Sequence, residues 1–165
     1  MYWTCWPDKI MRAQMDGTEV VQILSGRDHP VGLAIDFDES RLYWSEYGAH
    51  QICSRALNGS KPWVEVLATS RPVGSSFGGW GVRYPWGIAV TDDYCVYWGN
   101  FHGNTLQRRE NWGGNTTILL REQGHIQQLT TTKWNFPTSR ANDCMGQNCG
   151  HNICVLTTSS FRCVR

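Results

Sequence analysis

The chain has 165 residues, of which 12% are aromatic, and nine are tryptophan. Disordered segments are poor in large apolar side chains, so this composition predicts one folded domain with at most a small appendage. Fifteen Lys and Arg balance fourteen Asp and Glu to a net charge of +1, without any basic run, and we therefore expect no nucleic-acid partner.

No stretch of the sequence approaches the roughly 18 apolar residues that span a bilayer. The first residues, MYWTCWPD, have neither the basic start nor the apolar core of a secretory signal peptide. We expect any link to a membrane to come only from parts of a longer protein.

The dipeptide Tyr-Trp occurs three times, at residues 2–3, 43–44 and 97–98. After each pair come an apolar run, a turn dipeptide and a second apolar run. The turn dipeptides are Asp16-Gly17, Asn58-Gly59 and Gly113-Gly114. Such pairs favour positive φ at both central positions of a tight turn, so each copy predicts a β-hairpin.

A Pro-x-Gly turn and a short apolar strand precede the second and third pairs, in PVGLAID (30–36) and PWGIAVT (85–91). One full unit therefore predicts four strands in a meander, which we name A to D. In the second copy these are GLAID, RLYWS, ICSRAL and WVEVL. Four antiparallel strands repeated about every 40 residues are typical of a β-propeller blade, which stacks on its neighbours to bury its faces.

The third copy is followed by residues 124–142, in which IQQLTTT has the composition of a strand. This segment lies where a ring-closing strand or the start of another blade would be. The fold prediction is thus all-β, with two complete blades, one partial blade and this strand. Because side chains alternate along a strand, we expect Tyr43 and Trp44 to point to opposite faces of their blade.

Four of the seven cysteines lie in the last 22 residues. This clustering favours a small unit cross-linked by disulfides and therefore an oxidising, extracellular setting. The spacing of Cys149, His151 and Cys154 also fits a structural zinc site. Mass measurement before and after reduction separates the two, because reducing two disulfides adds about 4 Da and a zinc site gains nothing.

Two glycosylation sequons, at Asn58 and Asn115, agree with an extracellular setting. The remaining cysteines, Cys5, Cys53 and Cys95, occupy different positions in their copies, so no bridge recurs within the repeat. We expect them to be buried thiols or residues whose partner lies outside this chain.

Tyr-Trp-Thr-Cys, Tyr-Trp-Ser-Glu and Tyr-Trp-Gly-Asn resemble the Tyr-Trp-Thr-Asp repeat of low-density lipoprotein receptor family propellers, and NDCMGQNCGHNICVLTTSSFRC resembles the EGF-like module that follows them. The resemblance implies a chain truncated at both ends: residues 1–140 would form the C-terminal half of a six-bladed propeller, and residues 141–165 the start of the EGF-like module. It also implies disulfides Cys144–Cys154 and Cys149–Cys163.

The copies depart from the family repeat at its fourth position, which holds Cys5, Glu46 and Asn100 instead of Asp. We expect Glu46 to be a structural or surface acid. The calcium signature of some EGF-like modules is missing from the residues before Cys144, which read SRAND. We therefore expect no calcium, no other metal and no cofactor.

A meander places the B–C and D–A connections at one end of every blade, which we call the top face, and the A–B and C–D connections at the other, the bottom face. Both sequons lie in C–D connections, so glycans would occupy the bottom face and leave the top face for a partner. The second D–A connection is also long: Leu67 to Pro85 spans 18 positions, against 6 from Leu24 to Pro30.

Aromatic, His and Arg side chains of these connections predict a partner-binding surface on the top face, because binding residues concentrate on loops and these residue types are enriched at interface hot spots. The predicted residues are Trp6, Tyr47, His50, Trp80, Arg83, Tyr84, Phe101 and His102. For Trp6, Tyr47 and Phe101, which follow the fourth repeat position, packing between blades is an equal alternative. For the long connection the alternative is surface decoration.

Propellers also occur as enzymes, but carboxylates such as Asp36 and Asp92 do not recur at one position of successive blades, and no catalytic motif is present. We therefore expect no catalysis. The resemblance instead implies the extracellular, ligand-binding part of a single-pass receptor, which either releases lipoprotein-type ligands at endosomal pH or binds Wnt-type ligands. His50 and His102, at equivalent loops, would titrate in the endosomal range.

Two alternatives to the receptor hypothesis remain. Basement-membrane proteins of the nidogen type carry similar propellers beside EGF-like modules and bind matrix ligands. A metal-dependent propeller hydrolase would need a bound divalent cation.

Overall fold

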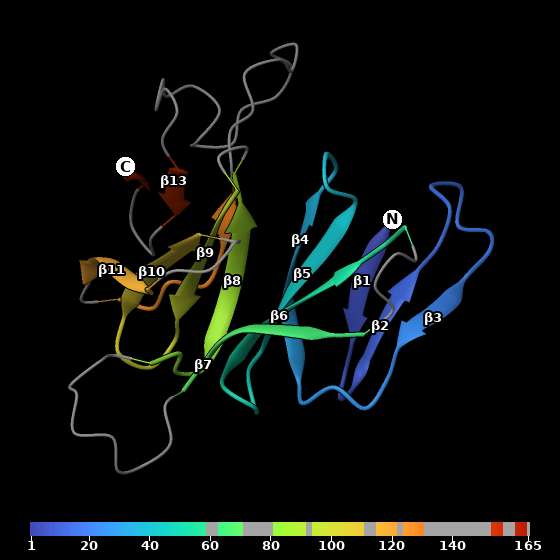
Figure 1. Cartoon of the computed structure of the whole chain (residues 1–165), viewed down its shortest axis with the longest axis horizontal. Helices are drawn as coiled ribbons and strands as arrows, with labels where there is room; N and C mark the ends of the chain where they lie inside the picture. The colour runs from blue at the N-terminus through green and yellow to red at the C-terminus, as the bar shows by residue number, and fades with distance from the viewer. Residues whose placement is uncertain are drawn as a thin grey trace.

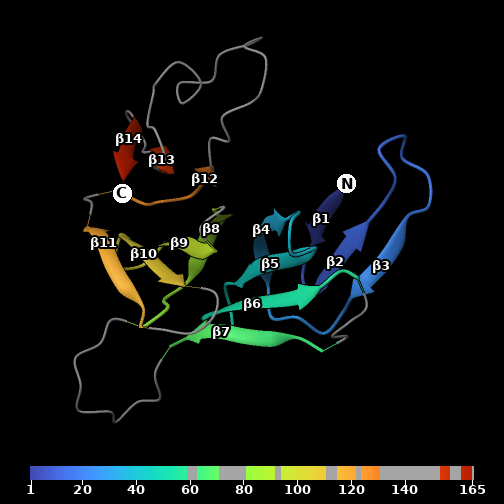
Figure 2. The same ribbon diagram turned by 45° about the horizontal axis from the view of Figure 1, so that its top comes forward.

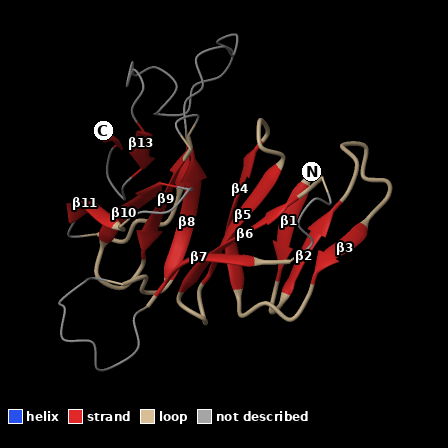
Figure 3. Ribbon diagram, in the orientation of Figure 1, coloured by secondary structure: helices blue, strands red, loops and turns tan. Residues whose placement is uncertain are grey.

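The computed structural model describes residues 1–58, 63–70, 81–91, 94–110, 115–121 and 124–130, and the backbone of 153–156 and 161–164. Every regular element in these residues is a β-strand, which confirms the all-β prediction (Figures 1 and 3). The described part of the chain has no helix with the length and apolar character needed to cross a bilayer.

The strands form four antiparallel sheets, each paired in the order of the chain. The first contains β1 (Tyr2–Cys5), β2 (Lys9–Arg12) and β3 (Val21–Leu24). The second contains β4 (Pro30–Asp36), β5 (Arg41–Glu46), β6 (Gln51–Ala56) and β7 (Glu65–Thr69). The third contains β8 (Pro85–Val90), β9 (Cys95–Asn100), β10 (Thr105–Glu110) and β11 (Thr117–Arg121). The last contains β12 (Leu129–Thr130), β13 (Ile153–Leu156) and β14 (Phe161–Val164).

The predicted four-strand meander is therefore confirmed in the second and third sheets, and the first sheet holds strands B to D. Figure 2 shows the sheets fanned side by side, with the A strands β4 and β8 on the inner side and the D strands outside. The A strands of neighbouring blades contact each other, β4 with β8 and β8 with β12.

Two details differ from the sequence prediction. Strand D of the second blade begins at Glu65, two residues later than expected. The C–D connections of all three blades are longer than a two-residue turn: β2 ends at Arg12 and β3 begins at Val21, β6 ends at Ala56 and β7 begins at Glu65, and β10 ends at Glu110 and β11 begins at Thr117. Gly17 has the expected positive φ, at 86°. The Asp16 side chain accepts a hydrogen bond on Oδ1 from the Thr18 amide, at 2.9 Å, and this bond stabilises a wider turn.

The strand expected in IQQLTTT is β12, and it pairs with β13 to begin a further sheet. Both alternatives, a ring-closing strand and the start of another blade, stay predictions. Cys144 and Cys149 lie outside these residues, so the two disulfides, the zinc alternative and the boundary at residue 140 stay predictions.

The Tyr-Trp dipeptide joins the blades, as predicted. Tyr43 and Trp44 are both fully buried, and they belong to different core clusters. Tyr43 packs with Trp98 of the third blade, while Trp44 packs with Ile10 of the first. Each blade interface therefore takes the Tyr of one copy and the Trp of the next, because adjacent residues of strand B face opposite sides of the sheet.

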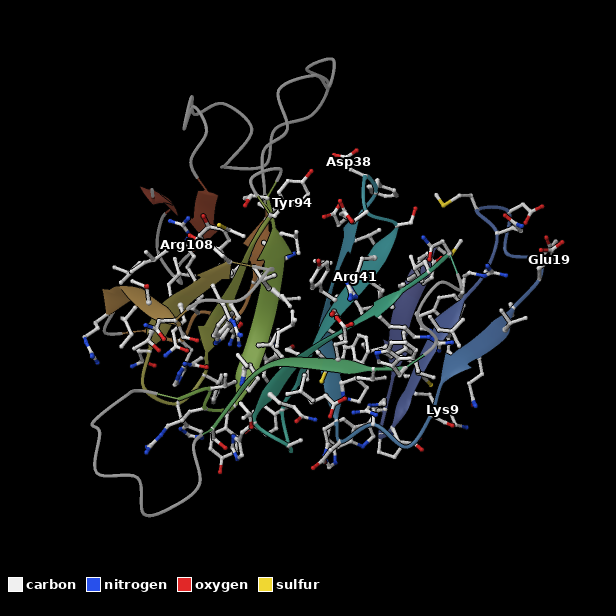
Figure 4. All side chains as sticks on the ribbon, viewed as in Figure 1. Lys9, Glu19, Asp38, Arg41, Tyr94 and Arg108 are labelled. Carbon is white, nitrogen blue, oxygen red and sulfur yellow. The ribbon has the colours of Figure 1, made fainter. Side chains whose placement is uncertain are left out.

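The two-face arrangement is visible in Figure 4. Asp38 and Tyr94, in A–B turns, lie along the same edge as Glu19, in a C–D connection. Lys9, beside a B–C turn, lies at the opposite edge. The top face therefore points downwards in Figures 1 and 4. Asn58 and Asn115 are exposed and lie beyond the ends of C strands, on the bottom face, as the meander predicts.

Candidate functional site

Glu46, at the fourth repeat position, connects strand B of the second blade to the D–A connection before it. Its side chain is 1% exposed, and Oε1 accepts hydrogen bonds from Arg27 Nε at 2.5 Å and Trp44 Nε1 at 2.8 Å. Gln51 Nε2 donates to Oε2 at 2.8 Å. Burial by itself raises the pKa of Glu46, but these hydrogen bonds and the Arg27 charge outweigh it and leave the pKa below its usual value. Glu46 is thus a structural acid, and its burial excludes the surface alternative.

Asn100 occupies the same position in the third blade and connects strand B to the D–A connection without charge. Its Oδ1 accepts a hydrogen bond from the Arg83 amide at 3.0 Å, and its Nδ2 donates to Thr105 Oγ1 at 3.0 Å. Val82, 1% exposed, stands three residues before Pro85, as Arg27 stands three residues before Pro30. The chain therefore has two arrangements at this place: an ion pair in one blade, and in the next an amide together with an apolar residue at the sequence position of Arg27.

The ring of the aromatic residue after the fourth position contacts the ring of the residue that precedes the next A strand or its equivalent, and this contact recurs at three blade junctions. The ring centroids are 4.2 Å apart for Trp6 and His29, 4.8 Å for Tyr47 and Tyr84, and 4.1 Å for Phe101 and His125. Trp6, Tyr47 and Phe101 therefore take part in packing between blades, which was the alternative to partner binding. All three rings also keep exposed surface, and Trp6 is 69% exposed.

The second and third of these junctions merge into one continuous group of rings, which we call the top-face cluster. It consists of Tyr47, His50, Tyr84, Trp86, Phe101, His102 and His125.

Tyr84 lies at the centre of the cluster, with ring centroids 4.1 Å from His50 and 4.6 Å from His102. Its amide donates to His50 Nδ1 at 2.9 Å, and its carbonyl accepts from the Phe101 amide at 2.9 Å. Its φ of 48° lies in the left-handed region, which turns the chain into β8. Trp86 closes the cluster between Tyr47 and Phe101, at 5.6 and 5.5 Å. Offset and edge contacts of this kind contribute about 0.5–1.5 kcal/mol each beyond their buried area, which favours a preformed surface.

Five of the predicted site residues thus come together in the cluster: Tyr47, His50, Tyr84, Phe101 and His102. The exposed Arg83 adjoins it in the chain, and its amide is held by Asn100. Trp6 forms a separate pair with His29. Trp80 lies outside the described residues.

Sequence reasoning missed His29, Trp86 and His125. His29 and His125 stand at the position of Tyr84, directly before an A strand or its equivalent. Trp86 is the middle residue of Pro85-Trp86-Gly87, which lies inside β8 and not in the turn predicted there. Aligning the D–A connections as well as the B–C loops would have found them.

Other chemistry is limited in the described residues. They contain no group of three His, Cys, Asp or Glu side chains placed to hold a metal ion. A groove of about 360 Å³ runs across the starts of the three A strands, and glycine backbone, apolar side chains and two glutamines line it.

Cys5 is exposed, whereas Cys53 and Cys95 are buried. Burial and the neighbouring Glu46 raise the pKa of Cys53 to about 12, so its thiol stays protonated and unreactive.

No protein-family model matches the chain. Low-density lipoprotein receptor-related protein 5 of Mus musculus and of Homo sapiens are each 29% identical to it over 160 residues, which cover 94% of this chain. The chain is thus similar over almost its whole length to a segment of low-density lipoprotein receptor-related proteins. It spans only 9% of the length of these two relatives.

Solved structures confirm the fold of the chain. The crystal structure of a nidogen/laminin complex superposes with a TM-score of 0.72 at 20% identity, over 98% of this chain and 54% of that one. A gluconolactonase from Xanthomonas campestris superposes with a TM-score of 0.64 at 19% identity, over 94% and 43%. At these identities the likeness shows the fold alone, and it agrees with a partial β-propeller.

Proposed function

We propose that this chain is an extracellular, ligand-binding segment of a low-density lipoprotein receptor-related protein, and that the top-face cluster binds a protein ligand. In this proposal the segment is tied to a membrane only by other parts of a longer, single-pass protein. The observation that carries it is the cluster itself, in which loops of two blades and the connection leading out of the third bring seven rings together on one face.

The composition of the cluster supports protein recognition. Tyr, Trp and Arg are the residue types that dominate binding energy at interfaces. Here two tyrosines and Trp86 contact one another, and the exposed Arg83 is next to Tyr84 in the chain. The rings are partly exposed, but contacts and hydrogen bonds already hold them in place. Binding would therefore cost little additional side-chain conformational entropy. The sequons at Asn58 and Asn115 lie on the other face, where glycans leave the cluster accessible.

The ligand remains to be chosen from three classes: Wnt-type proteins, lipoproteins and matrix proteins. Laminin is a concrete matrix candidate, since it accompanies nidogen in the superposed complex. For ligand release at endosomal pH the relevant group is His50, whose Nδ1 accepts the Tyr84 amide hydrogen.

We further propose that the chain is not an enzyme. Among the described residues that line the groove across the A strands, none is a carboxylate or a histidine. A metal-dependent hydrolase of this architecture would need oxygen or nitrogen ligands there. Elemental analysis of the purified, dialysed protein tests this proposal, and a stoichiometric divalent cation would overturn it.

The binding proposal is tested with Tyr84→Asn, because Asn tolerates the left-handed backbone of this position and removes the central ring. Phe37→Ala is the matched control, since Phe37 is 77% exposed in an A–B turn of the bottom face. Binding to immobilised laminin, low-density lipoprotein and a Wnt protein is measured for both. We expect Tyr84→Asn to weaken binding of one ligand by about tenfold or more, and Phe37→Ala to have no effect. Equal effects of the two variants would contradict a top-face site.

A further inference from the structure

Ser45, at the third repeat position, lies opposite a β-bulge. The pairing of β4 with β5 runs from Pro30–Glu46 directly to Leu33–Trp44, so that Val31 and Gly32 together oppose Ser45. A bulge takes backbone groups out of the regular ladder, and these groups then need other partners.

The Ser45 hydroxyl supplies such a partner and reaches across to the next blade. Its Oγ accepts the Gly32 amide at 2.9 Å and donates to the carbonyl of Trp86, in strand β8, at 2.6 Å. Ser45 is fully buried. One hydroxyl therefore links two A strands that belong to separate sheets.

Gly32 completes this junction. A Cβ at Gly32 would overlap the Trp86 carbonyl oxygen and press on Ser45 Oγ, so glycine is what allows the two A strands to approach. The Trp86 backbone is thus held from two sides, by a hydrogen bond from Ser45 and by close packing on Gly32.

The same device recurs in the first blade, where Thr4 Oγ1 donates to the Val31 carbonyl at 3.2 Å. Val31 stands at the position of Trp86 but carries no ring. The third blade has Gly99 at this position, and Ile126 packs against it where a side chain would be. Only the Ser45 junction therefore acts on a residue of the top-face cluster.

We propose that Ser45 is a positioning residue of the top-face cluster: its hydrogen bond to the Trp86 carbonyl sets the place of the Trp86 ring between Tyr47 and Phe101. The hydroxyl has no exposed surface and contacts no ligand. Its effect on binding rests on the proposed function, whereas its effect on Trp86 does not.

The test compares Ser45→Ala, Ser45→Cys, Ser45→Thr and Thr4→Ala in the whole chain by hydroxyl-radical labelling read by mass spectrometry. Ser45→Ala removes the hydrogen bond and leaves the Trp86 carbonyl without it, so we expect labelling of Trp86 to rise by about threefold. Ser45→Thr keeps the hydroxyl, as Thr4 does, and should match the parent chain. Ser45→Cys, a weaker donor of similar size, should lie between them and carries the test if Ser45→Ala does not fold.

Thr4→Ala is the matched control, because it removes the same kind of interblade hydrogen bond, to the Val31 carbonyl, while both Ser45 hydrogen bonds keep their partners. It should leave Trp86 labelling unchanged. Unchanged labelling in Ser45→Ala and Ser45→Cys, or an equal rise in Thr4→Ala, would overturn the proposal.

Binding of laminin to the same variants is the second measurement. Weaker binding of Ser45→Ala together with unchanged binding of Thr4→Ala supports both the positioning role and the binding site. Raised Trp86 labelling with unchanged binding would keep the positioning role and argue against the cluster as the laminin site.

Discussion

Replacing Glu46 by Asn tests whether the fourth repeat position holds the blades as described. The substitution leaves Arg27, whose side chain is 21% exposed, without its carboxylate, and leaves the Trp44 indole without its acceptor. Breaking a buried ion pair by removing one partner costs about 3–5 kcal/mol, and the partial exposure of Arg27 puts the expected loss near the lower end, at about 3 kcal/mol.

The third blade suggests a second substitution that should restore the stability lost in Glu46→Asn. Val82 and Asn100 occupy the places of Arg27 and Glu46, so the double variant Arg27→Val/Glu46→Asn copies a pair that this chain already uses. Removing both charges avoids an unpaired buried charge, and the double variant should lie within about 1 kcal/mol of the parent chain. The coupling energy of the cycle should then be at least about 2 kcal/mol.

Urea unfolding of the four proteins at pH 7 measures this coupling. Its pH dependence gives a second check, since the pKa of Glu46 is lowered in the folded state. The stabilisation is present above the carboxyl pKa of the unfolded chain, about 4.3, and is lost as the pH falls through the lower folded value. A double variant no more stable than Glu46→Asn, or a coupling that grows below pH 4, would refute this account.

Further predictions concern single groups. Iodoacetamide at pH 8 should alkylate the exposed Cys5 and spare Cys53, whose pKa is about 12, as mass spectrometry of tryptic peptides will show; equal modification would contradict its burial. Gly32→Ala should destabilise the chain by about 2 kcal/mol or more, because the new Cβ meets backbone of the next blade; an unchanged urea midpoint would argue against that approach. Protein secreted from eukaryotic cells should lose mass at Asn58 and Asn115 on treatment with an N-glycosidase; a bare asparagine at both would remove one support for an extracellular setting.

The blade meander and its packing residues could be predicted from the sequence, because they depend on local rules. Alternation along a strand decides that Tyr43 and Trp44 face opposite sides, whatever lies there. Chain order in a meander decides which loops share a face, and this places Tyr47, His50 and Phe101 on the top face before any contact is known. The similarity to low-density lipoprotein receptor-related proteins could also be predicted from the Tyr-Trp repeat.

Other features were decided only by the tertiary structure. Glu46 pairs with Arg27, and Ser45 with Trp86, over 19 and 41 positions of the chain, and no local pattern marks such pairs. His125 and Trp86 join the cluster because the B–C loop of one blade contacts residues that lead into the next blade or begin it. Local periodicity tells which side of a strand a residue takes, but its partner on that side depends on how the blades stack, and that is set by long-range packing.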